Sequence, residues 1–240
     1  MPTRYKRLGG LKPPTVIQAK AARTLRKATR RMLNDYEGGV LTEAQARSWQ
    51  IRFAEIADVM VDAIGKDMVK YSKRNIESSL GAMASELTVS NYVTPKIQDI
   101  IDKHTTDMVG YIKSIPVEYH EKIQRAVIDV DGDAEKLKSI IKDIGHSTES
   151  RAELIARDQI SKFNGALNTA RMDEAGIQRV MWRHSGGSGT PRPLHVDYDG
   201  EIFDLNDPPI IDEETGERGW AGDLINCRCF MVPVIEERTA

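Results

Sequence analysis

Two cysteines and two histidines near the C-terminal end of the chain are the residues best suited to chemistry. Cys227 and Cys229 stand one residue apart in the run Asn-Cys-Arg-Cys, and His184 and His195 precede them. Zinc takes four nitrogen or sulfur ligands, and closed sites of this composition are structural. The four residues therefore form a candidate structural zinc site. The tight Cys-x-Cys spacing leaves an alternative open, in which the thiols only pack and the histidines are surface or capping residues.

A second chemical set surrounds His195. On an extended chain alternate residues share a face, so His195, Asp197 and Asp199 would lie together. An imidazole and two carboxylates can hold a metal ion or transfer protons. This pattern predicts, as an alternative function, a metal-dependent hydrolase or nuclease that uses these residues and the cysteine pair. A polar strand face beside the tight turn at Asp199-Gly200 is the competing interpretation, and the turn chemistry favours it.

The first 36 residues carry a strong positive charge. They contain ten Lys or Arg and a single acidic residue, Asp35, which gives +9 in a chain whose net charge is −2. Five of the cations on the helix expected from Thr15 stand beside an apolar stripe: Arg23, Arg26, Lys27, Arg30 and Arg31. Such a segment suits an acidic partner, either double-stranded DNA or an acidic protein surface. The apolar stripe favours docking on a protein, with DNA contact second, and a solvated helix face is the simpler alternative.

The elements that position these residues indicate an α+β protein, with a mostly helical N-terminal part and a small antiparallel β module at the C-terminus. Residues 1–12 contain Gly9-Gly10 and are expected to form a flexible or partner-ordered arm. After them, apolar residues recur at every third or fourth position, which predicts helices. The expected helices cover approximately residues 15–36, 42–87, 95–113, 117–130, 137–144 and 148–175. Thr42 is expected to begin the second of these helices through a capping box with Gln45.

The pattern changes after Gly176. Residues 179–183 and 229–234 are predicted strands, and Trp182 is expected to be a buried anchor between the last helix and the sheet. Asp199-Gly200 predicts a hairpin flanked by residues 196–203. The glycine-rich stretch 185–190 lacks the Gly-Lys-Ser/Thr of a phosphate loop, so a mobile loop is expected there.

No run of about 18 apolar residues is present, and the N-terminus lacks the apolar core of a signal peptide. We therefore expect no membrane partner and synthesis in the cytoplasm. Two cysteines one residue apart are a strained disulfide pair, which fits a reducing compartment.

An ordered set of short motifs runs from about residue 150 to residue 233. In order, the pieces are 154–159, Asn164, Asn168, Arg171, 175–177, Trp182, 192–195, Asp199-Gly200 and 222–229. Together they resemble the Mu F-like head morphogenesis family of tailed bacteriophages, the minor head proteins. On this basis we divide the chain into a basic arm and helix (1–36), a helical region (37–147) and a Mu F-like module (148–240).

The resemblance implies a structural protein rather than an enzyme. It implies a minor head protein that acts in head morphogenesis and capsid assembly, at the portal vertex or inside the capsid. The implied partners are the portal protein and the major capsid or scaffolding protein, with packaged double-stranded DNA as a further contact. The implied location is the virion, with the host cytoplasm during assembly, and the only cofactor in view is the candidate structural zinc.

Overall fold

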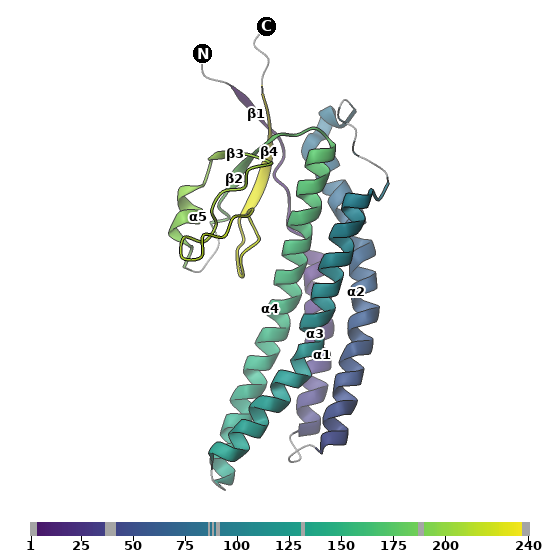
Figure 1. Cartoon of the computed structure of the whole chain (residues 1–240), viewed down its shortest axis with the longest axis vertical. Coiled ribbons are helices and arrows are strands. Elements are labelled where there is room, and N and C mark those ends of the chain that lie inside the picture. Colours follow the sequence, from purple (N-terminus) through teal and green to yellow (C-terminus); the bar gives the residue numbers. More distant parts are fainter. Residues whose placement is uncertain are drawn as a thin grey trace. The chain divides into compact units, whose positions relative to one another are not determined.

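The structure is a computed structural model that describes residues 4–36, 42–85, 87, 89, 92–130, 133–186 and 190–236. It confirms the α+β class, with long helices and one small antiparallel sheet (Figure 1). The elements are β1 (Tyr5–Arg7), α1 (Thr15–Tyr36), α2 (Glu43–Leu80), the 3-10 helix η1 (Gly81–Ser85), α3 (Pro95–Asp129), α4 (Ala134–Glu174), β2 (Arg179–Arg183), α5 (Pro193–Asp197), β3 (Ile202–Asp204) and β4 (Phe230–Glu236). None of the helices in the described ranges has both the length and the apolar character that crossing a membrane requires.

The chain forms two compact units that interleave along the sequence. We call residues 1–14, 66–102 and 160–240 the sheet unit, and residues 15–65 and 103–159 the bundle unit. Each of the helices α2, α3 and α4 contributes one segment to the sheet unit and another to the bundle unit. The three-part division by sequence remains a prediction, and its boundary at residues 147/148 falls inside α4.

The bundle unit consists of α1 and segments of α2, α3 and α4 (Figure 1). The apolar stripe of α1 is fully buried here, since Leu25 and Met32 have no exposed surface. The predicted capping box at the start of α2 is confirmed. The Thr42 N–H donates to Gln45 Oε1 at 2.9 Å, and the Gln45 N–H donates to Thr42 Oγ1 at 3.3 Å. Both orphan donors are thereby satisfied, which fixes where the helix begins.

Two helix breaks expected from the sequence are wrong. Pro116 lies inside α3, and the helix is held through that point by the packing of Ile112, Ile115 and Tyr119, all at most 1% exposed. The expected helices 137–144 and 148–175 are likewise one helix, α4. Thr148 does not cap a new helix, because its hydroxyl donates back to the Ile144 carbonyl at 2.8 Å. In both cases tertiary packing overrides a local breaker signal.

The sheet unit is built on four antiparallel strands in the order β1-β4-β2-β3. The predicted strands at 179–183 and 229–234 are confirmed as β2 and β4, which pair from Arg179 with Val234 to Arg183 with Phe230. Val180 and Trp182 of β2 face a core that includes Met172 of α4 and Ile76 of α2. Trp182 is 1% exposed, so the prediction of a buried anchor is confirmed.

The N-terminal segment is part of the sheet unit and is not a flexible arm. Strand β1 pairs with the outer edge of β4, and the N–H groups of Leu8 and Leu11 donate to the carbonyls of Pro233 and Met231, both at 3.0 Å. Leu11 is buried in the core. The expectation of a free arm fails because glycine and charge patterning report local flexibility only, whereas the backbone of an extended segment can be taken up by a sheet edge.

The predicted hairpin at Asp199-Gly200 is also wrong. Residues 193–197 are helical, with Pro193 at the first position of α5, and β3 pairs with β2 instead of with the preceding residues. Gly200 has a φ of 93° and its N–H donates to the Trp182 carbonyl at 2.9 Å. The turn therefore connects a short helix to an edge strand.

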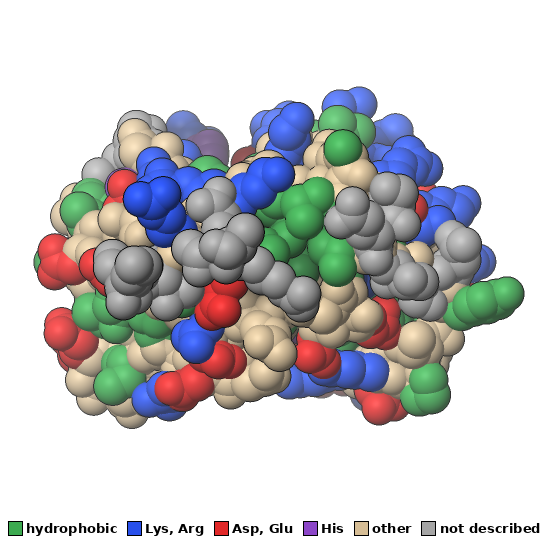
Figure 2. All heavy atoms as spheres, turned by 90° about the horizontal axis from the view of Figure 1, so that it is seen from above, with side chains coloured by type: hydrophobic (Ala, Val, Ile, Leu, Met, Phe, Trp, Pro, Cys, Tyr) green, Lys and Arg blue, Asp and Glu red, His purple; other side chains and the backbone are tan. Residues whose placement is uncertain are grey.

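Charged side chains of both signs are mixed on the face that Figure 2 shows, and hydrophobic side chains form patches between them. Scattered apolar surface of this kind is normal for a folded protein and does not by itself indicate a binding site.

Candidate functional site

Three segments of the sheet unit bring a histidine–cysteine cluster together. His184 directly follows β2, His195 lies on α5, and Cys227 and Cys229 lie in the loop that leads into β4. His195 Nδ1 is 3.4 Å from Cys227 Sγ and 3.9 Å from Cys229 Sγ, and Cys229 Sγ is 3.7 Å from His184 Nδ1. The donor atoms of His195, Cys227 and Cys229 all lie within 4.8 Å of one another. The four residues singled out from the sequence are thus neighbours, and three of them converge on one point.

His195 is held rigidly. It is 3% exposed, and its Nε2 lies 3.1 Å from the Ile211 carbonyl, which can only accept a hydrogen bond. The ring also packs edge-on against Trp182, with 5.0 Å between ring centroids. The hydrogen bond with Cys227 raises the pKa of His195, although burial acts in the opposite direction. These contacts fix the position of the imidazole, with Nε2 toward the Ile211 carbonyl and Nδ1 turned to the sulfurs.

The hydrogen bond between the two thiols shifts their pKa values in opposite directions. The hydrogen bond from Cys229 lowers the pKa of Cys227 to about 4, and the bond with His195 acts in the same direction. The same bond to Cys227 raises the pKa of Cys229, while the Trp182 indole favours its thiolate. A thiolate is the form of cysteine that binds metals and attacks electrophiles. The cluster is consequently prepared to bind a soft cation.

A pocket of ≈ 550 Å³ opens beside the cluster. Its walls come from the segment after β2, the start of α5 and the Asn-Cys-Arg-Cys turn, and they include the exposed side chains of Thr190, Arg192 and Arg228. Arg192 spans part of the mouth, because one of its guanidinium N–H groups donates to the Ile225 carbonyl at 3.2 Å. The pocket gives an ion a path from solvent to the buried sulfur of Cys229.

The structure does not bring the aspartates into this cluster. The expected extended face is absent because α5 turns Asp197 outward, where it is exposed. Asp199 instead accepts a hydrogen bond from the His184 N–H at 2.9 Å and pairs with Arg183 at 3.1 Å. Among the described residues, the only group of three or more metal-binding side chains is His195, Cys227 and Cys229. The carboxylate set expected for hydrolysis is therefore not assembled.

The five basic residues named from the sequence lie on α1, in the bundle unit. Arg26 pairs with Glu153 and Arg30 pairs with Glu149 at 2.9 Å, so two of the five are bound to α4. Arg23, Lys27 and Arg31 are exposed. They recur at four-residue spacing, which places them along one side of the helix. We call these three residues the α1 basic row.

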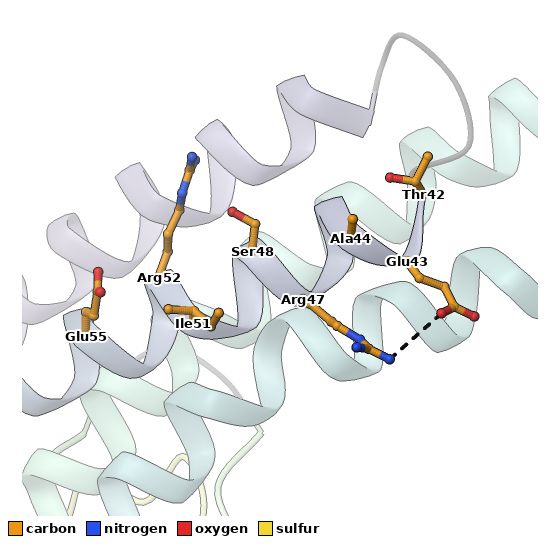
Figure 3. Close-up of a pocket in the computed structure, with 8 residues that line it drawn as sticks. All are labelled: Thr42, Glu43, Ala44, Arg47, Ser48, Ile51, Arg52 and Glu55. Carbon is orange, nitrogen blue, oxygen red and sulfur yellow. Dashed lines mark ion pairs between the residues drawn. The ribbon is translucent and has the colours of Figure 1, made fainter.

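A second hollow runs along the beginning of α2, and Figure 3 shows that every side chain lining it comes from this one stretch of chain. Arg47 and Glu43 point toward each other at 3.9 Å, and Ile51 is 61% exposed. An exposed pair four residues apart on a helix stabilises it by only a few tenths of a kcal/mol. The hollow holds no metal-binding or nucleophile–base pair, so we assign it no function.

Sequence reasoning missed three groups around the cluster. They are the indole N–H of Trp182, the carbonyl of Ile211, and the carboxylate of Asp223, which accepts a hydrogen bond from the Trp220 N–H at 2.6 Å. Burial raises the pKa of Asp223. The Gly-Asp that precedes the Asn-Cys-Arg-Cys run was the available signal for Asp223. Nothing in the sequence singles out the carbonyl of Ile211.

Comparison with known proteins identifies the class of this cluster-bearing region. Residues 118–232 match the family of phage Mu protein F like proteins, so the resemblance found from the sequence is confirmed and this region is Mu F-like. The matched region contains all four residues of the histidine–cysteine cluster.

The chain is also similar to an uncharacterized protein of Haemophilus influenzae, with 39% identity over 146 residues. The similarity covers 60% of this chain and 31% of the relative, so the chain spans about a third of that protein's length. No solved structure matches the chain.

Proposed function

We propose that this protein is a minor head protein that acts in phage head morphogenesis, at the portal vertex or on the inner capsid surface. The observation that carries the proposal is the family match over residues 118–232. The match covers the end of α3, all of α4, the elements β2, α5 and β3, and the start of β4. The portal protein and a major capsid or scaffolding protein are the partners that this role requires.

The test is incorporation into procapsids. Full-length protein is produced together with the portal and capsid proteins of the same phage, and assembled particles are purified and analysed for its presence. We expect the protein in the particles and co-elution with the portal protein. Particles that assemble normally and exclude the protein would contradict the proposal.

The α1 basic row is our candidate for contact with packaged DNA. The apolar stripe of α1 is buried in its own unit, with Leu25 and Met32 at 0% exposure, so it is not available to a protein partner. The argument that placed DNA second therefore no longer holds. What α1 offers outward is the charge of Arg23, Lys27 and Arg31, and DNA phosphates need only charge.

The contact is tested by the salt dependence of DNA binding. Each lost phosphate contact reduces the slope of log K against log salt by about 0.9. We expect a shallower slope for the variant Arg23→Gln, Lys27→Gln and Arg31→Gln. The matched control removes the same charge from exposed positions on α3 in the same unit: Lys103→Gln, Lys122→Gln and Arg125→Gln. Equal slopes in the two variants would contradict a specific role of the α1 basic row.

A further inference from the structure

The histidine–cysteine cluster brings four candidate ligands together from three separate segments of the sheet unit, and the donor atoms of His195, Cys227 and Cys229 lie within 4.8 Å of one another. We propose that it binds one zinc ion through Cys227 Sγ, Cys229 Sγ, His195 Nδ1 and His184 Nδ1. Trp182 does not touch the ion in this proposal, and its indole N–H positions the Cys229 thiolate. The proposal goes beyond the role in head assembly and does not depend on it. It concerns the isolated chain.

The distances between donor atoms fit a tetrahedral zinc ion. With Zn–S of about 2.3 Å and Zn–N of about 2.0–2.1 Å, tetrahedral geometry separates a sulfur from a nitrogen by about 3.6 Å. Three of the four sulfur–nitrogen separations in the cluster are 3.4, 3.7 and 3.9 Å. An ion at the centre therefore requires adjustments of only a few tenths of an ångström along these edges.

The orientation of His195 matches that of a metal ligand. A zinc-bound imidazole uses one nitrogen for the ion and usually donates the other N–H to a carbonyl or carboxylate. The Ile211 carbonyl, 3.1 Å from Nε2, fills this second role and leaves the Nδ1 lone pair turned toward the sulfurs. Burial of the ring at 3% exposure keeps it in this position.

The backbone conformation of the turn that carries the cysteines also favours binding of one ion by both sulfurs. Asn226 has a φ of 63°, the left-handed region that non-glycine residues rarely adopt, and Gly222 has a φ of 103°. The Cys227 N–H donates to the Leu224 carbonyl at 3.0 Å, which closes the turn. The two sulfurs then lie on one side, while Arg228 between them is exposed. This geometry allows two cysteines one residue apart to bind the same ion.

Trp182 supplies a second and independent observation. Its indole N–H is buried and makes no hydrogen bond of normal geometry. A buried donor without a partner is rare and requires an explanation. The indole and Cys229 belong to the same buried core cluster of the sheet unit. A thiolate bound to zinc stays deprotonated and accepts such a bond, which explains the donor.

The first experiment is substitution with cobalt. The full chain is purified under reducing conditions, its zinc content is measured, and Co²⁺ is titrated into chelator-treated protein. We expect about one metal per chain, with the visible bands of tetrahedral cobalt and a thiolate-to-cobalt charge-transfer band. A wild-type chain that binds neither ion, or a cobalt spectrum without thiolate charge transfer, overturns the proposal without any variant.

Variants then test each assigned group. Cys227→Ser should remove much of the charge-transfer band, and His184→Gln should change the visible bands, whereas the exposed control His146→Gln should change neither. An unchanged spectrum for His184→Gln overturns the four-ligand assignment.

The role of Trp182 has its own control. Trp182→Phe keeps a ring but loses the N–H, so zinc affinity measured by chelator competition should fall about 10–100-fold while the cobalt spectrum keeps its tetrahedral form. Trp49→Phe also loses an indole hydrogen bond, to Asp35 at 2.9 Å in the bundle unit, and should leave zinc affinity unchanged. Equal affinities for Trp182→Phe and the wild type would remove the positioning role.

Discussion

At the scale of single residues, the structure assigns unequal roles to chemically similar positions. Gly10 and Gly110 are both glycines of no obvious importance in the sequence. A Cβ on Gly10 would lie 2.8 Å from Cε2 of Phe230, whereas a Cβ on Gly110 would meet nothing within 4 Å. Gly10 permits the N-terminal segment to approach β4 closely. Gly110 lies inside α3, where glycine makes the helix less stable than alanine would.

The pair gives a direct prediction. Gly10→Ala should lower the free energy of unfolding by about 1–3 kcal/mol, because the new methyl group must displace Phe230 or the backbone. Gly110→Ala should raise it by about 0.5–1 kcal/mol, because alanine is the better residue inside a helix. Urea denaturation measures both, and a neutral Gly10→Ala would show that the segment does not pack closely on β4.

Trp182 is the largest side chain buried in the sheet unit. Besides His195 it contacts Tyr198 and Phe203, with ring centroids 5.5 and 6.5 Å apart. Trp182→Ala should therefore cost roughly 3–5 kcal/mol in the free energy of unfolding. A loss under about 1 kcal/mol would mean that the core closes over the cavity or that the residue is not buried in solution.

At the scale of elements, α2 holds the N-terminal segment through a polar ladder at four-residue spacing. Tyr71 donates its hydroxyl to the Pro13 carbonyl at 3.0 Å, Asn75 forms two bonds with the backbone of Lys12, and the Ser79 hydroxyl donates to the Gly9 carbonyl. The same side of a helix thus follows an extended backbone over about two turns. This ladder and β4 together replace the free arm expected from the sequence.

Asn75 is the most informative member of this ladder, because its amide both accepts from the Lys12 N–H and donates to the Lys12 carbonyl, each at 3.0 Å. Asn75→Ala should cost roughly 1–3 kcal/mol, since the backbone groups lose their partners. Amide exchange at Gly9 and Leu11 should also increase. Asn34→Ala, at an exposed position of α1, is the control and should stay within about 0.5 kcal/mol of wild type. Unchanged exchange at Gly9 and Leu11 would show that the backbone bonds to Ser79 and β4 hold the segment without Asn75.

At the scale of the whole molecule, all four proposed metal ligands belong to the sheet unit. If the ion stabilises only the sheet unit, its removal should increase local unfolding in that unit first. We expect chelation to increase amide exchange at Trp182 and Gly200, whose backbone groups bond β2 to the turn before β3, and to leave the α1 amides Leu25 and Met32 unchanged. Equal loss of protection in both units would show instead that the chain unfolds as one cooperative whole.

The interleaving of the two units also changes what truncation can show. Residues 1–36 supply β1, the buried Leu11 and the whole of α1, whose stripe fills the bundle core. Deleting them removes core from both units, so loss of function in such a variant says nothing about the basic charges. Charge variants of the α1 basic row avoid this problem.

The sequence by itself determined the features that depend on local pattern. Apolar spacing predicted α1 and the strands around Trp182, and the side chains of Thr42 and Gln45 predicted the start of α2. Residue chemistry also pointed to the four side chains of the cluster, because cysteine and histidine are rare in this chain, and the structure brings three of them within 4.8 Å of one another. The ordered motifs were sufficient to identify the Mu F-like region.

Tertiary structure alone decided the features that depend on partners distant in the chain. Pro116 and Gly145 look like breakers locally, but α3 and α4 continue through them. The neighbours of Pro116 on α3 are buried, and Gly145 is itself buried, where an added Cβ would lie 3.5 Å from Leu33 of α1. The N-terminal segment became a strand because β4, more than 200 residues later, offered an unpaired edge. His195 turned its Nδ1 to the cysteines because Ile211 accepts from the opposite nitrogen. Each outcome is set by a contact energy between residues far apart in sequence, which local propensity does not contain.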